Sequence, residues 1–210
     1  ISGVIEMLRM YDDLPRADRN RSLEMLEIET ERLKKLISEL LMLSRMENRI
    51  FSSEPEPIDV AKVLGQVVDA LKPLAGKKRQ SLELSMSLGA APVRGDEAWF
   101  FHAIQNLVEN AIKYTPAGGA IAVEAASDGR ELSIAVRDNG IGIAPEDIDR
   151  IFERFYRADK SRGSETGGSG LGLAIAKDII SLLNGDISVE SAPGSGSVFT
   201  VRIPLSRDAD

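Results

Sequence analysis

The chain has 210 residues, 43% of them hydrophobic and 28% charged, which is an ordinary composition for one full globular domain plus a smaller element. A net charge of −7 argues against a nucleic-acid binder, and the absence of cysteine excludes disulfides and thiolate metal sites. No apolar run approaches the roughly 20 residues of a membrane span, and no signal peptide opens the sequence.

The first 50 residues are predicted to form a helical hairpin. Apolar residues recur at helical spacing on both sides of a break at Asp12–Pro15, and the second helix carries a heptad-like seam that includes Leu26, Leu33 and Leu40. A single hairpin exposes too much apolar surface, so we predict that two copies form a four-helix bundle and that residues 1–50 hold a homodimer together. The alternative is that the seam packs against the domain that follows.

Residues 51–58 are predicted to be a linker, because Pro55 and Pro57 cannot continue a helix. Residues 59–206 are predicted to be one domain, with Asp59 as a helix cap. Its expected helices and strands, in chain order, are a helix to about 74, a strand at 82–86, a helix at 96–114, a hairpin at 121–136, a helix at 170–184 and a hairpin at 187–202. This order predicts the α+β class, with helices on one face of a mostly antiparallel mixed sheet.

The helix expected at 96–114 carries polar side chains in phase. Asn106 and Asn110 lie one turn apart, so both leave the same face beside Lys113 and Tyr114. Amide oxygens suit a Mg²⁺ ion that keeps several waters and bridges phosphates. Lys113 can reach a phosphate, and Tyr114 can pack on a purine. The alternative is that both asparagines only bond to neighbouring loops.

Asp138 ends a predicted strand and precedes Gly140 and Gly142. A carboxylate there can accept a hydrogen bond from an exocyclic amino group, which distinguishes adenine from guanine, and the glycines let the backbone approach the ring. The alternative is a plain Asp-Asn-Gly turn.

A second glycine cluster leads into an apolar helix. It comprises Gly168, Gly170, Leu171, Gly172 and Leu173. A helix N-terminus with glycines is an anion site, because free amides and the helix dipole face the phosphates. It is not a Walker loop, since no Gly-Lys-Ser or Gly-Lys-Thr occurs. The polar segment 159–169 ahead of it indicates a lid over a nucleotide, or only a surface loop.

Aromatic residues of Phe152–Tyr156 are expected to pack at the base of this lid, or only in the core. Arg157 can reach a γ-phosphate; the alternative is that it is only a solvated surface charge. His102 is the only histidine, and we expect it to be a packed or surface helical residue without a catalytic role. Asparagines, a strand-end Asp and a glycine-rich helix start in this order predict an ATP site.

Together these motifs resemble those of the sensor histidine kinases of two-component systems. Asn106–Tyr114 resembles their N box and Asp138–Gly142 their G1 box, and Phe152–Tyr156 resembles their F box. Gly168–Leu173 resembles the G2 box, and Gly194–Gly196 with Phe199 resembles the last glycine motif. The resemblance spans essentially the whole chain, including the dimerisation hairpin, and it implies the ATP-binding α/β sandwich shared with gyrase-type ATPases.

The resemblance also implies roles for single residues. Asn110 is the expected Mg²⁺ ligand and Asp138 the expected adenine reader, while Lys113 and Arg157 are expected to contact the terminal phosphate. Asn106 stands where the related ATPases carry a water-activating Glu, which argues against efficient hydrolysis. The expected cofactors are therefore ATP and Mg²⁺, in a kinase that spares ATP from water.

The chain departs from the family at its start. Members carry the phospho-accepting His in a His-Glu-Leu-Arg-Thr-Pro-like box, and Ile1–Leu8 resembles the segment just after it. Because Ile1 is not an initiator Met, we expect a fragment of a longer protein, with the His roughly two to three helical turns upstream. The chain should then bind Mg-ATP and be unable to autophosphorylate.

The resemblance implies a cytoplasmic kinase core on a parent anchored in the inner membrane. The parent would phosphorylate its own His and pass the phosphoryl group to an Asp of a response-regulator receiver domain. The leading alternative is a nucleotide-sensing dimeric scaffold without catalysis. An ATP-hydrolysing gyrase-like or chaperone-like module is disfavoured by Asn106, and a serine kinase acting on a partner protein by the hairpin. No nucleic-acid partner and no membrane contact by this fragment are expected.

Overall fold

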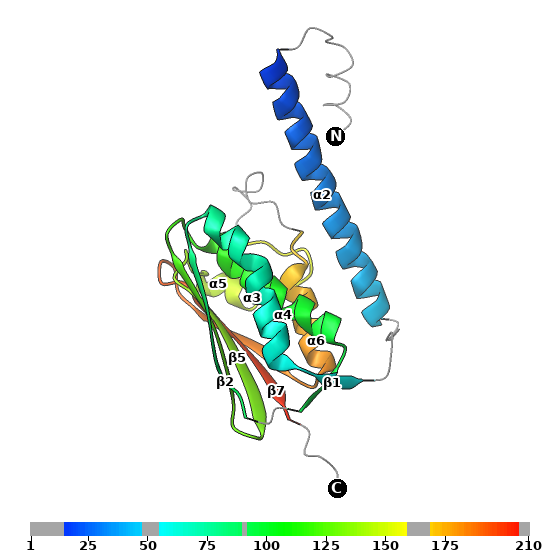
Figure 1. Ribbon diagram of the computed structural model, residues 1–210, viewed down its shortest axis with the longest axis vertical. Helices are drawn as coiled ribbons and strands as arrows, with labels where there is room; N and C mark the ends of the chain where they lie inside the picture. The colour runs from blue at the N-terminus through cyan, green and yellow to red at the C-terminus, as the bar shows by residue number, and fades with distance from the viewer. Residues whose placement is uncertain (1–14, 48–54, 90–91, 159–168, 206–210) are drawn as a thin grey trace. The chain divides into compact units, whose positions relative to one another are not determined.

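The computed structural model describes residues 15–47, 55–89, 92–158 and 169–205 (Figure 1). Contacts within the chain separate two units, with the boundary between Ser44 and Arg45. The first of the two predicted N-terminal helices and residues 51–54 of the predicted linker lie outside the described residues.

Helix α2 (Arg16–Glu47) makes up nearly all of the described part of the first unit, and its last three residues are counted with the second. It begins directly after Pro15, whose carbonyl accepts from the amides of Asp18 and Arg19. Ion pairs at i,i+3 spacing, such as Glu31 with Lys34, support its surface. Its exposed large apolar side chains are Leu23, Met25, Ile28, Leu33, Ile37, Leu40 and Leu41.

The second unit is built on a five-stranded sheet with the order β2-β4-β5-β7-β6. Its strands are β2 (Ser81–Ser87), β4 (Ala120–Ser127), β5 (Glu131–Asp138), β6 (Asp186–Ser191) and β7 (Ser197–Pro204). The β2–β4 pair is parallel and the other three pairs are antiparallel. The predicted α+β class and the mostly antiparallel mixed sheet are thereby confirmed.

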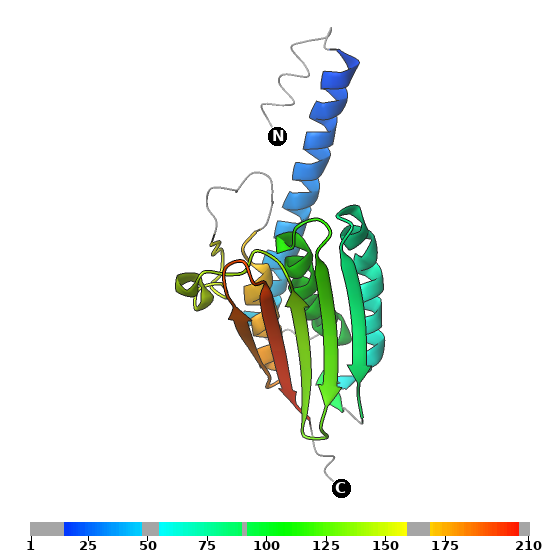
Figure 2. The same ribbon diagram turned by 90° about the vertical axis from the view of Figure 1, so that its left-hand side faces the viewer.

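Three helices lie on one face of this sheet, and Figure 2 shows its other face toward the viewer. They are α3 (Val60–Lys77), α4 (Glu97–Tyr114) and α6 (Gly172–Leu182), and a short helix α5 (Pro145–Ile148) follows β5. Alternate residues of the strands face the helices: Ile121 and Val123 of β4, and Leu132, Ile134 and Val136 of β5, are all buried. Among the described elements no helix covers the opposite face.

A two-stranded sheet lies beside the helix starts. Strand β1 (Glu56–Ile58) pairs antiparallel with β3 (Val93–Gly95), and the Arg94 guanidinium donates to the carbonyl of Pro55 at 2.9 Å. Both strands have only three residues, and neither was expected from the sequence. They lead directly into α3 and α4.

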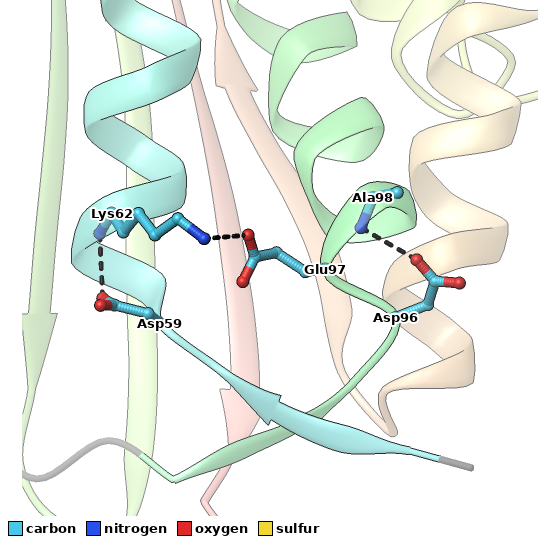
Figure 3. Close-up of polar contacts among 5 residues, drawn as sticks. All are labelled: Asp59, Lys62, Asp96, Glu97 and Ala98. Carbon is cyan, nitrogen blue, oxygen red and sulfur yellow. Dashed lines mark hydrogen bonds and ion pairs between the residues drawn. The ribbon is translucent and has the colours of Figure 1, made fainter. Parts of the chain in front are cut away.

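Side chains fix the starts of α3 and α4 (Figure 3). The Asp59 carboxylate accepts from the amide of Lys62 at 3.0 Å, and Asp96 accepts from the amide of Ala98 at 2.9 Å. Each satisfies amides that a helix start otherwise leaves free. The Lys62 ammonium bonds Glu97 at 2.7 Å and so joins the two helix starts.

Candidate functional site

Helix α4 carries four of the predicted site residues along one side. Other residues of α4, such as Ile104 and Leu107, are fully buried and anchor the helix in the core. This leaves Asn106, Asn110 and Lys113 half-buried, while Tyr114 is exposed and its ring lies 4.8 Å from the Lys113 ammonium. Two amides, a cation and an aromatic ring therefore share the last two and a half turns of one helix.

The loop that follows β5 packs against the end of α4. The carbonyl of Tyr114 accepts from the amide of Ile141 at 3.2 Å. Gly140 is so close to the same carbonyl that a Cβ there would lie 2.6 Å from its oxygen. A side chain at position 140 would push the loop away from the helix. The structure thus brings the Asp138–Gly142 segment next to Tyr114.

Asp138 lies at the end of β5 and is only 7% exposed. Its Oδ1 accepts from the amide of Gly140 at 2.8 Å. Burial raises the pKa of the Asp138 carboxyl, and backbone hydrogen bonds from Gly140 and Ser197 act in the opposite direction. A buried carboxylate in this loop is a strong acceptor for a ligand N–H group.

The turn between β6 and β7 supports this loop from the other side. Gly194 N donates to the carbonyl of Ile141 at 2.7 Å, and Ile143 N donates to Ser191 Oγ at 2.9 Å. The Ser191 hydroxyl in turn donates to the carbonyl of Gly196 at 2.8 Å. Gly142, at φ 71°, has no room for a Cβ because the carbonyl of Ala192 lies against it. Sequence reasoning missed Ser191, since a lone Ser at the end of a strand carries no signal.

The start of α6 lies against Asn106. A Cβ on Gly172, the first residue of α6, would lie 3.1 Å from Asn106 Oδ1. Leu171 is fully buried, its amide donates to Ser169 Oγ at 3.1 Å, and no side chain of the described residues caps the helix at Leu171. A helix start of this kind is suited to an anion. Leu173 is half-buried, and Gly168 lies outside the described residues.

Residues 150–157 form a turn that packs beside the start of α6. Phe155 has φ 65°, its amide donates to the carbonyl of Gly170 at 2.9 Å, and its side chain is 60% exposed. Phe152 instead packs edge-on against Phe199, with ring centroids 6.4 Å apart. Arg154 pairs with Asp178 of α6 at 3.2 Å. The two phenylalanines thus have different surroundings, one on the surface and one against the sheet.

Two further predicted residues lie near these elements. Arg157 is half-buried in the turn before the segment 159–168, which is outside the described residues. His102 is exposed on α4 and its ring makes an edge contact with Phe101, with centroids 6.0 Å apart. Within the described ranges, no group of three or more His, Cys, Asp and Glu side chains is placed to hold a metal ion.

Comparison with known proteins places these elements in one family. Residues 95–207 match the family described as histidine kinase-, DNA gyrase B- and HSP90-like ATPases. The sensor-like histidine kinase SenX3 of Mycolicibacterium smegmatis is 41% identical over 210 residues, which is all of this chain and 54% of SenX3. The chain spans about half the length of the curated relatives it matches.

Solved structures share the fold. Full-length ShkA in complex with AMPPNP has a TM-score of 0.75 at 27% identity, over 99% of this chain and 43% of ShkA. Histidine kinase ThkA, solved with the response regulator TrrA, has a TM-score of 0.76 at 21% identity, over all of this chain and 57% of that one.

None of the helices described here is long and apolar enough to span a bilayer.

Proposed function

The chain belongs to the sensor histidine kinases within the family of histidine kinase-, DNA gyrase B- and HSP90-like ATPases, and on this premise we propose that it is the ATP-binding kinase core of such a protein. The observation that carries the proposal is the meeting of three segments far apart in sequence. The end of α4 contacts the Asp138–Gly142 loop, and Asn106 of α4 contacts the start of α6.

Adenine would be read at Asp138. Its buried carboxylate accepts a hydrogen bond from the exocyclic amino group of adenine, while Gly140 and Gly142 let the loop that carries Asp138 pack closely against Tyr114 and Ala192. Tyr114 lies beside this loop and offers a ring face to the purine. Guanine carries a carbonyl oxygen where adenine carries the amino group, and a carboxylate repels it. The site therefore selects ATP over GTP.

The phosphates would lie between α4 and α6. Gly170, Gly172 and Leu173 would supply amides at the N-terminus of α6, whose dipole favours anions, and the predicted contributions of Gly168 and Leu171 complete this proposed phosphate site. Lys113 and Arg157 contribute positive charge at the terminal phosphate, where charge accumulates during transfer. Asn106 lies at the contact of the two helices and helps to line this part of the site.

The donor set fits a Mg²⁺ ion held chiefly by phosphates. Asn110 is half-buried on α4 and offers one amide oxygen, and the part of the chain that the structure describes has no carboxylate cage. Mg²⁺ commonly takes one or two protein ligands together with phosphate oxygens and waters. A bound ion would neutralise part of the phosphate charge. Asn110 would be the residue of α4 that holds it.

In the parent protein the γ-phosphoryl group would move from ATP to a nitrogen of the acceptor His, and ADP would leave. The P–O bond to ADP breaks as the P–N bond forms, and the protein contributes alignment and charge. The group would then pass to an Asp of a response-regulator receiver domain; ThkA, a protein of the same fold, was solved with a response regulator. We place this core in the cytoplasm, on a parent anchored in the inner membrane.

The test uses γ-labelled Mg-ATP with two proteins, this chain and the parent chain extended upstream of Ile1. The extended protein should acquire acid-labile, base-stable label, and this chain should bind ATP and acquire none. Asp138→Asn in the extended protein is the matched control and should lose the label at low ATP concentrations. ATP binding without label on either protein would contradict the kinase proposal and favour a nucleotide-sensing scaffold.

A further inference from the structure

The turn that follows α3 is bonded to the end of α4. Lys78 lies in this turn, and its ammonium donates to three carbonyl oxygens: 2.8 Å to Ile112, 2.9 Å to Lys113 and 3.2 Å to Thr115. Partial burial lowers the pKa of Lys78, as expected for an ammonium that exchanges water for protein carbonyls. One side chain thus satisfies three acceptors at a helix end.

Gln80 bonds to the same helix end. Its side chain is 7% exposed, and Nε2 donates to the carbonyl of Thr115 at 2.6 Å and to that of Ile112 at 3.0 Å. Backbone bonds run alongside, from Gly118 N to the carbonyl of Lys78 and from Ser81 N to the carbonyl of Gly119, both at 3.0 Å. The end of α4 is therefore attached to the α3–β2 turn by two side chains and by the main chain.

The end of α4 needs such donors. A helix leaves its last four carbonyls without partners, and many helices satisfy them by a turn through a left-handed residue. Here Thr115 is extended, with φ −86° and ψ 130°, and Pro116 follows, so the chain leaves α4 without that turn. A cation at this position also complements the negative end of the helix dipole.

The same helix end supports the candidate site. Lys113 and Tyr114 lie in the last turn, and the carbonyl of Tyr114 accepts from Ile141 N and packs against Gly140. We propose that Lys78 and Gln80 are positioning residues for nucleotide binding, which act through the last turn of α4 on the Asp138–Gly142 loop. This inference rests on the proposed ATP site, and neither side chain needs to touch the nucleotide.

The test compares ATP and ADP affinity, by calorimetry, for this chain and three variants. Lys78→Met keeps the aliphatic stem and removes the donors. Gln80→Met removes Nε2, together with an Oε1 that is buried and without a hydrogen-bond partner among the described residues, so this variant should fold. Lys77→Met is the control, because Lys77 is the exposed neighbour. We expect about five- to tenfold weaker binding for each of the first two variants, about 1–1.4 kcal/mol, and no change for the control.

A purely structural role would lower the melting temperature and leave the affinity of the folded protein unchanged. The second readout is therefore the hydrogen-exchange rate of the Ile141 amide, which bonds the Tyr114 carbonyl. It should rise in Lys78→Met and Gln80→Met, measured well below their melting temperatures, and Lys78→Arg should restore affinity and protection in part. If Lys78→Met does not fold, the nucleotide affinity and the Ile141 exchange rate of Gln80→Met test the proposal by themselves.

The two proposals fail in different ways. Wild-type affinity and an unchanged Ile141 exchange rate in the folded variants would overturn the roles of Lys78 and Gln80 and leave the ATP site intact. Absence of ATP and ADP binding by the wild-type chain itself would overturn the proposed function, together with the inference that rests on it.

Discussion

Asp138 is buried, and the adenine contact proposed above requires its carboxyl group to be charged. Its pKa is raised by burial, so the folded protein binds a proton more tightly than the unfolded chain does. Stability from this group is therefore fully present below the unfolded pKa of 3.8 and is lost as the pH rises through the raised folded pKa. Asp138 in its charged state thus lowers the stability of the unliganded domain.

From this we predict opposite effects of Asp138→Asn on stability and on binding. As the pH rises from 4 to 7, the free energy of unfolding of the wild type should fall relative to that of the variant. Urea denaturation at each pH measures this difference. ATP affinity of the wild type should fall as the pH drops through the raised pKa, whereas the variant should bind weakly at every pH. An affinity of the variant equal to that of the wild type at pH 7 would remove Asp138 from the adenine site.

Two glycines of the β6–β7 turn provide a matched pair for measuring close packing. Gly194 and Gly196 have φ of 77° and 79°, but only Gly196 packs its Cα against the carbonyl of Asp138. Gly194→Ala should cost about 1 kcal/mol of folding free energy, from the left-handed backbone alone. Gly196→Ala should cost about 3 kcal/mol or more, because the turn must also move away from Asp138. Chemical denaturation gives both values. Equal costs would show that the turn can move away from Asp138 without further loss of stability.

The sequence drew attention to some residues of the proposed site region and not to others, for a physical reason. Asp138, Gly140 and Asn106 were predicted because unusual residue types stood at a strand end, in a turn and inside a helix. Lys78, Gln80 and Ser191 were missed because they are common residue types that bond main-chain atoms of distant segments. Only the fold shows which carbonyls and amides lie within their reach.

At the scale of helices, a cap that accepts from a backbone amide should contribute more to the free energy of unfolding than an exposed ion pair does. Asp59 caps α3 through the amide of Lys62, and both partners of the Lys62–Glu97 pair are about half exposed. We predict that Asp59→Ala costs about 1 kcal/mol and that Asp59→Asn, which keeps the cap, costs much less. Lys62→Met should cost less than Asp59→Ala, because solvent screens the pair. Thermal and urea unfolding measure the stability of each variant. A larger loss of stability for Lys62→Met than for Asp59→Ala would contradict the prediction.

Elements with a repeating pattern were predictable. Alternation of apolar residues gave β4 and β5, and the predicted hairpin between them is confirmed by their antiparallel register. Strands β1 and β3 were missed because three residues are too few to show a period. The parallel pairing of β2 with β4 is also absent from the local sequence, since it depends on how α3 and α4 pack. Helix α3 continues through Pro73 to Lys77, beyond the expected end near Leu74.

At the scale of the whole molecule, the first unit leaves apolar side chains exposed in a single chain. Leu33 is 49% exposed and Leu40 is 42% exposed, one heptad apart on α2. We propose that a second copy covers them, and we predict that Leu33→Glu with Leu40→Glu shifts the chain from dimer to monomer in analytical ultracentrifugation. ATP affinity should stay unchanged, because the second unit has its own core. Lys34→Glu, on the exposed surface of the same helix, is the control. A wild-type chain that is monomeric at high concentration would contradict the proposal.

The place of β7 in the sheet has a consequence for how the protein is made. β7 is the last strand of the sheet along the chain, yet it lies between β5 and β6 and contributes the buried side chains of Phe199, Val201 and Ile203. A nascent chain on the ribosome therefore holds β5 and β6 without their shared neighbour until residue 204 has emerged. Completion of the sheet must wait for the end of translation of this domain. A premature stop before β7 should yield a product that the cell degrades, even though every nucleotide-site residue proposed here has been synthesised.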